Sequence, residues 1–229
     1  MSKIAIQGNA ANDQYTFTIA APAGTDSHTL TLPDEAGTVL TSASSITSSQ
    51  LPSGSRVLIS EDADGATGIS AIEISLPTGS TYDHYILKID DYYFTSGSGN
   101  DLVSQVAVGG TYQTGSSDYR YMGPATRTGV SINTNGSNGA NRIRWDWYSS
   151  GDSSSEPSVL HLQIWNSMDS GSFTRFFGIR TGQSTSNETL TVLTGGFRAN
   201  NEVNDKIKFY GHVGGNLAYA SYQLYGVVA

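Results

Sequence analysis

The feature that most constrains the fold of this chain is an alternation of apolar and polar residues, which recurs from about residue 70 onward. A period of two places alternate side chains on opposite faces of a strand, and no window shows a convincing helical period of 3.6. The alternation predicts strands over residues 71–76, 85–90, 102–108, 141–148, 159–165, 172–180, 188–194, 205–213 and 217–228. Strands at this spacing without helices predict an all-β sandwich or barrel, and a length of about 160 residues with long loops favours a jelly-roll β-sandwich.

Two of these predicted strands assign individual side chains to a face. In the fourth, Ile143 and Trp145 are expected to point inward and Asp146 outward. In the sixth, Phe177 and Ile179 share one face.

A short echo in the sequence precedes the alternating region. TFTI and TLTL begin 13 residues apart, and each is followed by an Ala-Gly-Thr turn. The apolar side chains that fall on one face of these two strands are Phe17, Ile19, Leu30 and Leu32. Strands this short cannot bury themselves alone. Two hypotheses follow, which are an ordinary hairpin at the edge of a domain and a stem closed by identical chains.

The turn after the second short strand fits a stem, because Pro33 ends the strand and Gly37 allows the chain to reverse. The Ser-rich tract SASSITSSQLPSGSR follows over residues 42–56 and is typical of a linker. The sequence therefore predicts an N-terminal extended β arm or stem with its linker, residues 1–56, and a head domain, residues 57–229.

The charge balance argues against nucleic acid as a partner. The chain has 12 basic and 20 acidic residues and a formal net charge of −8, and such a chain repels a phosphate backbone. Cysteine is absent, which excludes disulfides and thiolate metal sites. No apolar run approaches 18 residues and no charged leader precedes an apolar one, so we expect neither a signal peptide nor membrane insertion.

The motifs favour a protein without catalytic activity, cofactor or metal. No G-x-S-x-G elbow occurs, and the Gly-rich stretches at 96–100 and 135–139 lack the lysine of a phosphate loop, so we predict loop tips there. Asp90 and Asp91 are neighbours, so a strand points them to opposite faces and they cannot form a glycosidase dyad. The acidic stretch at 60–68 fails the EF-hand spacing; a solvated turn is favoured, and calcium held with loop carbonyls is the alternative. None of the four histidines has metal-ligand spacing.

Aromatic side chains are the candidates for a ligand surface. The rings that could form a sugar platform are Tyr92, Tyr93, Tyr119, Tyr121, Tyr148 and Trp165. Most of these rings are expected to fill the core or a subunit interface. The loop-borne set of Tyr112, Tyr119 and Tyr121 is the predicted surface contact for a ligand.

Three segments resemble virion proteins of tailed bacteriophages. TLTLPDEAGTVLT (29–41) is similar to the stem signature of their fibres and surface structural proteins. The stretch from YILKIDDYYF to residue 121 resembles the middle of phage jelly-roll modules. NDKIKFYGHVGGNLAYASYQLYGVVA (204–229) is similar to the closing two strands, including a Leu-Tyr-Gly ending. The order of stem, linker and module implies a homotrimer on a virion, although only about 60 residues precede the module here, fewer than a long tail fibre carries.

The resemblance implies a non-enzymatic structural protein at the virion surface, assembled in the cytoplasm of a bacterial host. One placement is a capsid decoration (cement or head-fibre) protein, whose arm grips the shell and whose partner is the major capsid protein. Another is a short tail fibre or fibre tip, whose partners are a tail component and a host surface glycan. A free carbohydrate-binding module is the hypothesis from another class. We favour decoration because the chain has no long shaft.

Overall fold

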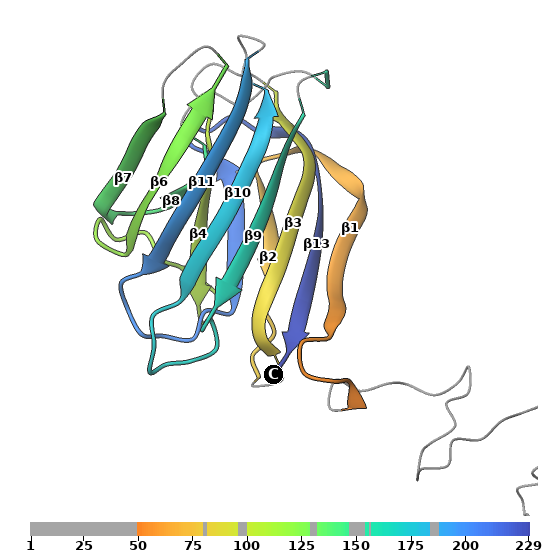
Figure 1. Cartoon of the computed structure of the whole chain (residues 1–229), viewed down its shortest axis with the longest axis vertical. Coiled ribbons are helices and arrows are strands. Elements are labelled where there is room, and N and C mark those ends of the chain that lie inside the picture. The colour runs from red at the N-terminus through yellow and green to blue at the C-terminus, as the bar shows by residue number, and fades with distance from the viewer. Residues whose placement is uncertain are drawn as a thin grey trace, which may run out of the picture. The chain divides into compact units, whose positions relative to one another are not determined.

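The regular elements of the computed structural model are β-strands, which confirms the predicted all-β class (Figure 1). The structure describes residues 50–79, 82–95, 100–128, 132–146, 154–155, 157–183 and 188–229. Its strands are β1 (Arg56–Ile69), β2 (Ala71–Ser75), β3 (Tyr82–Phe94), β4 (Leu102–Val108), β5 (Thr111–Tyr112), β6 (Tyr119–Arg127), β7 (Asn133–Ala140), β8 (Ile143–Arg144), β9 (Ser158–Trp165), β10 (Arg175–Gln183), β11 (Thr189–Arg198), β12 (Lys206–Gly211) and β13 (Leu217–Val228).

The strands form two antiparallel sheets in a sandwich-like arrangement. An eight-stranded sheet has the order β1-β13-β3-β9-β10-β11-β6-β7, and a five-stranded sheet joins β2-β12-β4-β5 with β8 paired to β4. Figure 1 shows the larger sheet in front of the smaller one. Antiparallel sheets of this kind bury one face against a partner layer and leave the other face to solvent.

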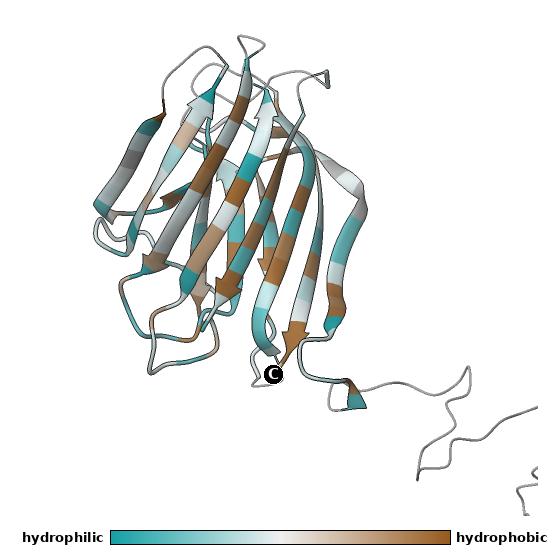
Figure 2. Cartoon of the chain, viewed as in Figure 1, coloured by the Kyte–Doolittle hydropathy of each residue, from teal (hydrophilic) through white to brown (hydrophobic). Residues whose placement is uncertain are grey.

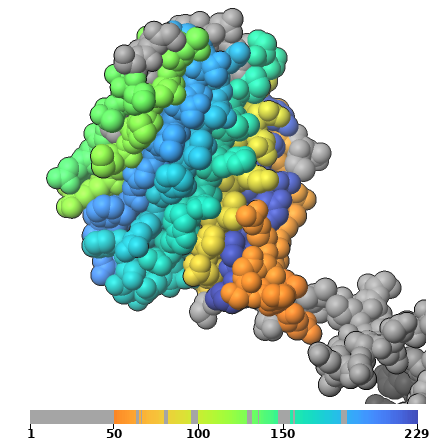
Figure 3. All heavy atoms as spheres, viewed as in Figure 1, coloured from red at the N-terminus to blue at the C-terminus, as the bar shows by residue number. Residues whose placement is uncertain are grey.

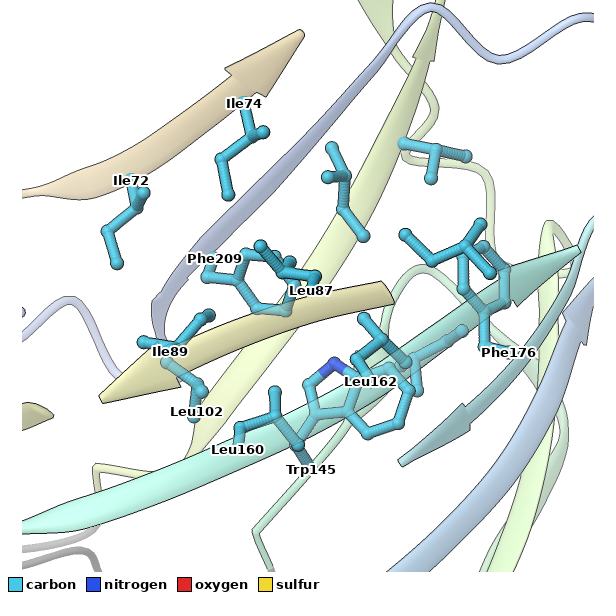
Figure 4. Packing of buried hydrophobic residues seen from close by; sticks show 14 of the residues in the cluster. Ile72, Ile74, Leu87, Ile89, Leu102, Trp145, Leu160, Leu162, Phe176 and Phe209 are labelled. Atoms are coloured by element: carbon cyan, nitrogen blue, oxygen red, sulfur yellow. The ribbon is translucent and has the colours of Figure 1, made fainter. Parts of the chain in front are cut away.

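The hydrophobic core lies between the two sheets (Figure 4). Ile72 and Phe209 come from the smaller sheet, and Leu87 and Leu162 from the larger, and all are buried. Alternate residues along the strands supply this core, as the period of two predicted. Burying one such side chain stabilises the fold by about 1.5–3 kcal/mol, so the two layers hold each other together.

All nine predicted strands have a counterpart, but the fourth is reduced to the two-residue β8. The sequence pattern missed β1, β5, β6 and β7. In β6, the inward positions after Tyr119 and Tyr121 are Gly123, which has no side chain, and Ala125, which has only a methyl group, so the apolar alternation is not visible in the sequence.

Two predicted turns are strands instead. The Gly-rich stretch at 135–139, predicted as a loop tip, lies within β7, an edge strand that backbone hydrogen bonding to β6 holds in place. The acidic stretch at 60–68 lies within β1, where the pairing with β13 is irregular between Asp62 and Ala66. Gly65 has a φ of 74° there, and its N–H donates to Asp62 Oδ1 at 3.2 Å.

The prediction that Asp146 points outward is wrong, because its side chain is buried in an ion pair. Ile143 and Trp145 point inward as expected, but the side chain of Asp146 is also 0 % exposed and lies 3.3 Å from Arg180. Strand β8 ends at Arg144, so Asp146 lies beyond it and the alternation of faces along a strand no longer applies to this residue. Arg180 additionally donates to the Ser158 hydroxyl at 2.7 Å.

Both ends of the folded head lie at one pole. Arg56 of β1 pairs with Val227 of β13, and the Gly54 N–H donates to the Val228 carbonyl at 2.9 Å. The predicted stem residues Phe17, Ile19, Leu30, Leu32, Pro33 and Gly37 lie outside the described residues. No helix among the described residues is long and apolar enough to cross a bilayer.

Candidate binding surface

The outward face of the eight-stranded sheet carries exposed apolar side chains. Phe177 and Ile179 of β10 are each 41 % exposed and Met122 of β6 is 69 % exposed. Figure 2 shows apolar residues along the strands of this sheet. The core receives the opposite face of β10, including Phe176 and Arg180, so the shared face predicted for Phe177 and Ile179 points to solvent. Single exposed apolar side chains are common on protein surfaces, whereas a group of large ones on one face indicates an interaction surface.

A groove of about 1050 Å³ opens on this face where β6, β11, β10 and β9 run side by side (Figure 3). It is lined by Arg120, Tyr121, Met122, Gly136, Ser137, Asn138, Trp165, Asn166, Phe173, Arg175, Phe176, Gly195, Gly196 and Phe197. Gly195 lies between Met122 and Phe177 in the strand register. A Cβ placed on Gly195 would meet no atom within 4 Å. The missing side chain therefore leaves this part of the groove open.

Aromatic rings form the walls of the groove. The rings of Phe173 and Phe197 are stacked, with centroids 5.5 Å apart and an angle of 21° between their planes. Trp165 is stacked on His84 at 5.7 Å. These contacts hold flat apolar surfaces in fixed orientations, which suits a ligand with a flat apolar side.

Two guanidinium groups flank the aromatic wall. Phe197 is directly opposite Arg120 on β6 and directly opposite Arg175 on β10. The Arg120 guanidinium lies 5.8 Å from the centre of the Phe197 ring. Among the described residues neither arginine forms an ion pair, and the described lining residues include no carboxylate. The groove is thus locally basic in a chain whose net charge is −8.

Polar groups complete the rim. Asn166 follows β9 with a φ of 58°, a left-handed conformation that asparagine tolerates, and its carbonyl accepts a hydrogen bond from the Thr174 hydroxyl at 3.3 Å. Ser137 donates to the Gly139 carbonyl at 2.8 Å. With Asn138, these residues add amide and hydroxyl groups to the groove.

The three tyrosines predicted as a ligand-contact set occupy different environments. Tyr119 is 0 % exposed; its hydroxyl accepts from the Val106 N–H at 2.9 Å and donates to the Gln113 carbonyl at 3.1 Å. Burial raises its pKa. Tyr119 is therefore a core residue and presents no side-chain surface to a ligand.

Of the other two predicted tyrosines, only Tyr121 lines the groove, where it is mostly buried. Tyr112 belongs to β5 of the smaller sheet, and Lys208 Nζ lies 4.1 Å from the centre of its ring. The structure thus places the three predicted tyrosines in different parts of the fold and not on one surface.

Sequence reasoning included Trp165 among the candidate sugar-stacking rings but missed Phe173, Phe197, Arg120 and Arg175. The two arginines are 55 positions apart, and only the pairing of β6, β11 and β10 brings them to one wall. The sequence did show that Phe177 and Ile179 share an apolar face. Alternation alone cannot distinguish an exposed apolar face from a core face.

No group of three or more His, Asp or Glu side chains that could hold a metal ion occurs in the described part of the chain. The groove residues offer rings that stack, guanidinium groups that bind anions, and amides that exchange hydrogen bonds. Their chemistry is that of recognition.

The fold and the groove together define an all-β protein of two antiparallel sheets with a basic, aromatic-walled groove on the larger sheet. Comparisons with protein-family models, curated proteins and solved structures gave no match to this chain.

Proposed function

We propose that this chain is a non-enzymatic structural protein of a bacteriophage virion, displayed as a homotrimer at the particle surface. In this proposal it is a capsid decoration protein. The arm, residues 1–56, attaches it to the major capsid protein, and a jelly-roll head, residues 57–229, stands above the shell.

The observation that carries the proposal is the order in which the strands pair. The first strand, β1, pairs with the last, β13, while the second, β2, pairs with the second last, β12. β3 then lies beside β13 and β4 beside β12, so successive early strands alternate between the two sheets. This winding is expected of a jelly roll, in which a long antiparallel ribbon wraps around one core. The hairpins β6–β7 and β10–β11 extend the larger sheet beyond β9.

The polarity of the head also supports an arm-and-head layout. β1 starts next to the end of β13, so the chain enters the head at the pole where it finishes. An attachment made through the segment that precedes β1 would therefore start from this one pole. Three heads on one stem would bind a multivalent surface with an affinity gain of roughly 10²–10⁴.

Copy number on purified particles tests the placement. Quantitative mass spectrometry of virions is expected to find hundreds of copies of the chain per particle, in a fixed ratio to the major capsid protein. Its absence from virions would contradict the proposal.

The groove favours a second candidate, a short tail fibre or fibre tip that contacts a host glycan. A handful to a few dozen copies per virion, together with blocking of adsorption by the purified protein, would select this placement. A positive glycan array with no virion-borne copies would instead favour a free carbohydrate-binding module.

A further inference from the structure

We propose that the groove on the eight-stranded sheet binds an acidic saccharide, meaning an oligosaccharide whose rings carry carboxylate groups. This inference goes beyond placement on a virion and does not depend on it, because it rests only on the groove residues.

Charge is the first argument for this ligand class. Arg120 and Arg175 stand on either side of Phe197, both exposed, with no carboxylate among the described residues that line the groove. In an acidic chain, two guanidinium groups that form no ion pair with a carboxylate of the described residues are available to an external anion. Arginine binds carboxylates through paired N–H donors, which gives direction as well as charge.

A second cavity on the same chain provides a comparison. This cavity, of about 540 Å³, is also lined by aromatic rings, those of Tyr82 and Tyr85, but it includes the carboxylates Asp83 and Asp169. Its described lining contains no arginine or lysine. Basic character therefore belongs to the groove and is not a general property of the hollows in this head.

Ring stacking is the second argument. The C–H faces of a sugar ring are flat and apolar, while its edges carry hydroxyl groups. Phe173, Phe197 and Trp165 offer flat apolar surfaces, and Asn138 and Asn166 add amides that can both donate to and accept from hydroxyls. An acidic peptide would satisfy the guanidinium groups but has no flat apolar face to match this wall.

The open position at Gly195 is the third argument. Its neighbours Met122 and Phe177 project from the adjacent strands, while an added Cβ at Gly195 would meet nothing within 4 Å. This leaves a channel between side chains in which a ring can lie close to the backbone. A larger residue at this position would fill the channel from the protein side, and its Cβ would meet no atom within 4 Å.

Titration of the full chain with defined saccharides tests the proposal. The probes are tetragalacturonate, a hyaluronan tetrasaccharide and an α-2,8-linked sialic acid tetramer, with fully methyl-esterified tetragalacturonate as a neutral counterpart. Calorimetry and tryptophan fluorescence are expected to show saturable binding of at least one acidic probe, one molecule per chain. Where the binder is tetragalacturonate, its neutral counterpart should bind about tenfold more weakly or worse. Added salt should weaken binding of whichever acidic probe binds.

Two groove variants with matched controls locate the site. Gly195→Leu should abolish binding by filling the channel, whereas Thr191→Leu, four residues away on the same outward face of β11, should bind normally. The double variant Arg120→Gln/Arg175→Gln should lose binding about tenfold or more, whereas Lys88→Gln, on β3 outside the groove, should not. Near-ultraviolet circular dichroism checks that each variant is folded.

Several outcomes would overturn the inference. These are the absence of saturable binding to all three acidic probes at millimolar concentration, unchanged binding by a folded Gly195→Leu variant, or equal binding of a neutral and an acidic probe. Saturable binding of an Asp/Glu peptide in place of the saccharides would also overturn it and assign the groove to a protein partner.

Discussion

At the residue scale, the least expected feature is the buried pair of Asp146 and Arg180. Both side chains are 0 % exposed and lie 3.3 Å apart, and Arg180 also donates to the hydroxyl groups of Ser158 and Tyr92. A buried charge pair gives little net stability relative to apolar residues, but one partner without the other is costly.

We therefore expect Asp146→Ala to lower the free energy of unfolding by about 3–5 kcal/mol, because the Arg180 guanidinium loses its buried counter-charge. The double variant Asp146→Leu/Arg180→Met should recover much of this loss. Urea denaturation of the three proteins measures both effects. A loss below about 1 kcal/mol for Asp146→Ala would show that Arg180 is not held as a buried cation.

A second prediction concerns pH and Asp101, whose carboxylate forms an ion pair with the Arg144 guanidinium. Burial, and then the nearby Asp146 carboxylate, raise the pKa of Asp101 to about 6. The unfolded value is about 3.9, so the folded state binds the proton more tightly between these values. Stability contributed by this group therefore falls as pH rises from about 4 to about 6, by roughly 2–3 kcal/mol.

Comparison with Asp101→Asn isolates this effect. Burial lowers the pKa of His212, so that group makes stability rise with pH and partly opposes Asp101 in the wild type. As pH rises from 4 to 6.5, the free energy of unfolding of the wild type should fall relative to that of Asp101→Asn. A difference that is constant with pH would refute the raised pKa.

At the element scale, two glycines in adjacent strands have opposite roles. A Cβ on Gly123 of β6 would lie 1.7 Å from the Leu193 carbonyl oxygen of β11, whereas one on Gly195 of β11 would meet no atom within 4 Å. The first glycine allows two strands to approach, and the second opens the groove.

The matched substitutions should accordingly differ in sign. Gly123→Ala is expected to destabilise the head by more than about 2 kcal/mol, since a backbone oxygen cannot move aside without breaking the β6–β11 pairing. Gly195→Ala should be neutral or stabilise by up to about 1 kcal/mol, because it removes the entropy cost of glycine in a strand. Thermal melts followed by circular dichroism compare them, and equal shifts would argue against the close approach at Gly123.

At the scale of the whole molecule, the buried hydrophobic residues of the described part of the chain run from Ile72 to Val228. The described residues thus assemble a hydrophobic core between the two sheets. The arm's proposed role can therefore be tested by deleting it.

Deletion of residues 1–41 should leave a folded head with a cooperative melting transition. The shortened protein should no longer form trimers in sedimentation experiments or attach to virions, because the short Thr-rich strands are proposed to join only in a threefold stem. The full chain is the control. Attachment retained by the shortened protein would remove the anchoring role of the arm.

Local sequence pattern was enough to predict the all-β class and most of the strands. Residues such as Ile72, Leu87 and Leu162 alternate with polar neighbours, and a period of two is a local property of the chain that needs no partner to be recognised. Reliance on a local pattern also explains why strands such as β7 were not predicted. β7 has no apolar face, and its strand structure depends on pairing with β6.

Only the tertiary structure decided which face of a strand is the core face. Phe177 and Ile179 lie on one side of β10 and Phe176 and Arg180 on the other, and the local sequence does not indicate which side is the core face. In the folded chain Arg180 is buried beside Asp146, which follows β8, whereas Phe177 is exposed. The groove likewise needed strand register to join Arg120 to Arg175 across Phe197. Alternation is encoded in neighbouring residues, whereas inside, outside and juxtaposition arise only when distant strands pair and one layer covers another.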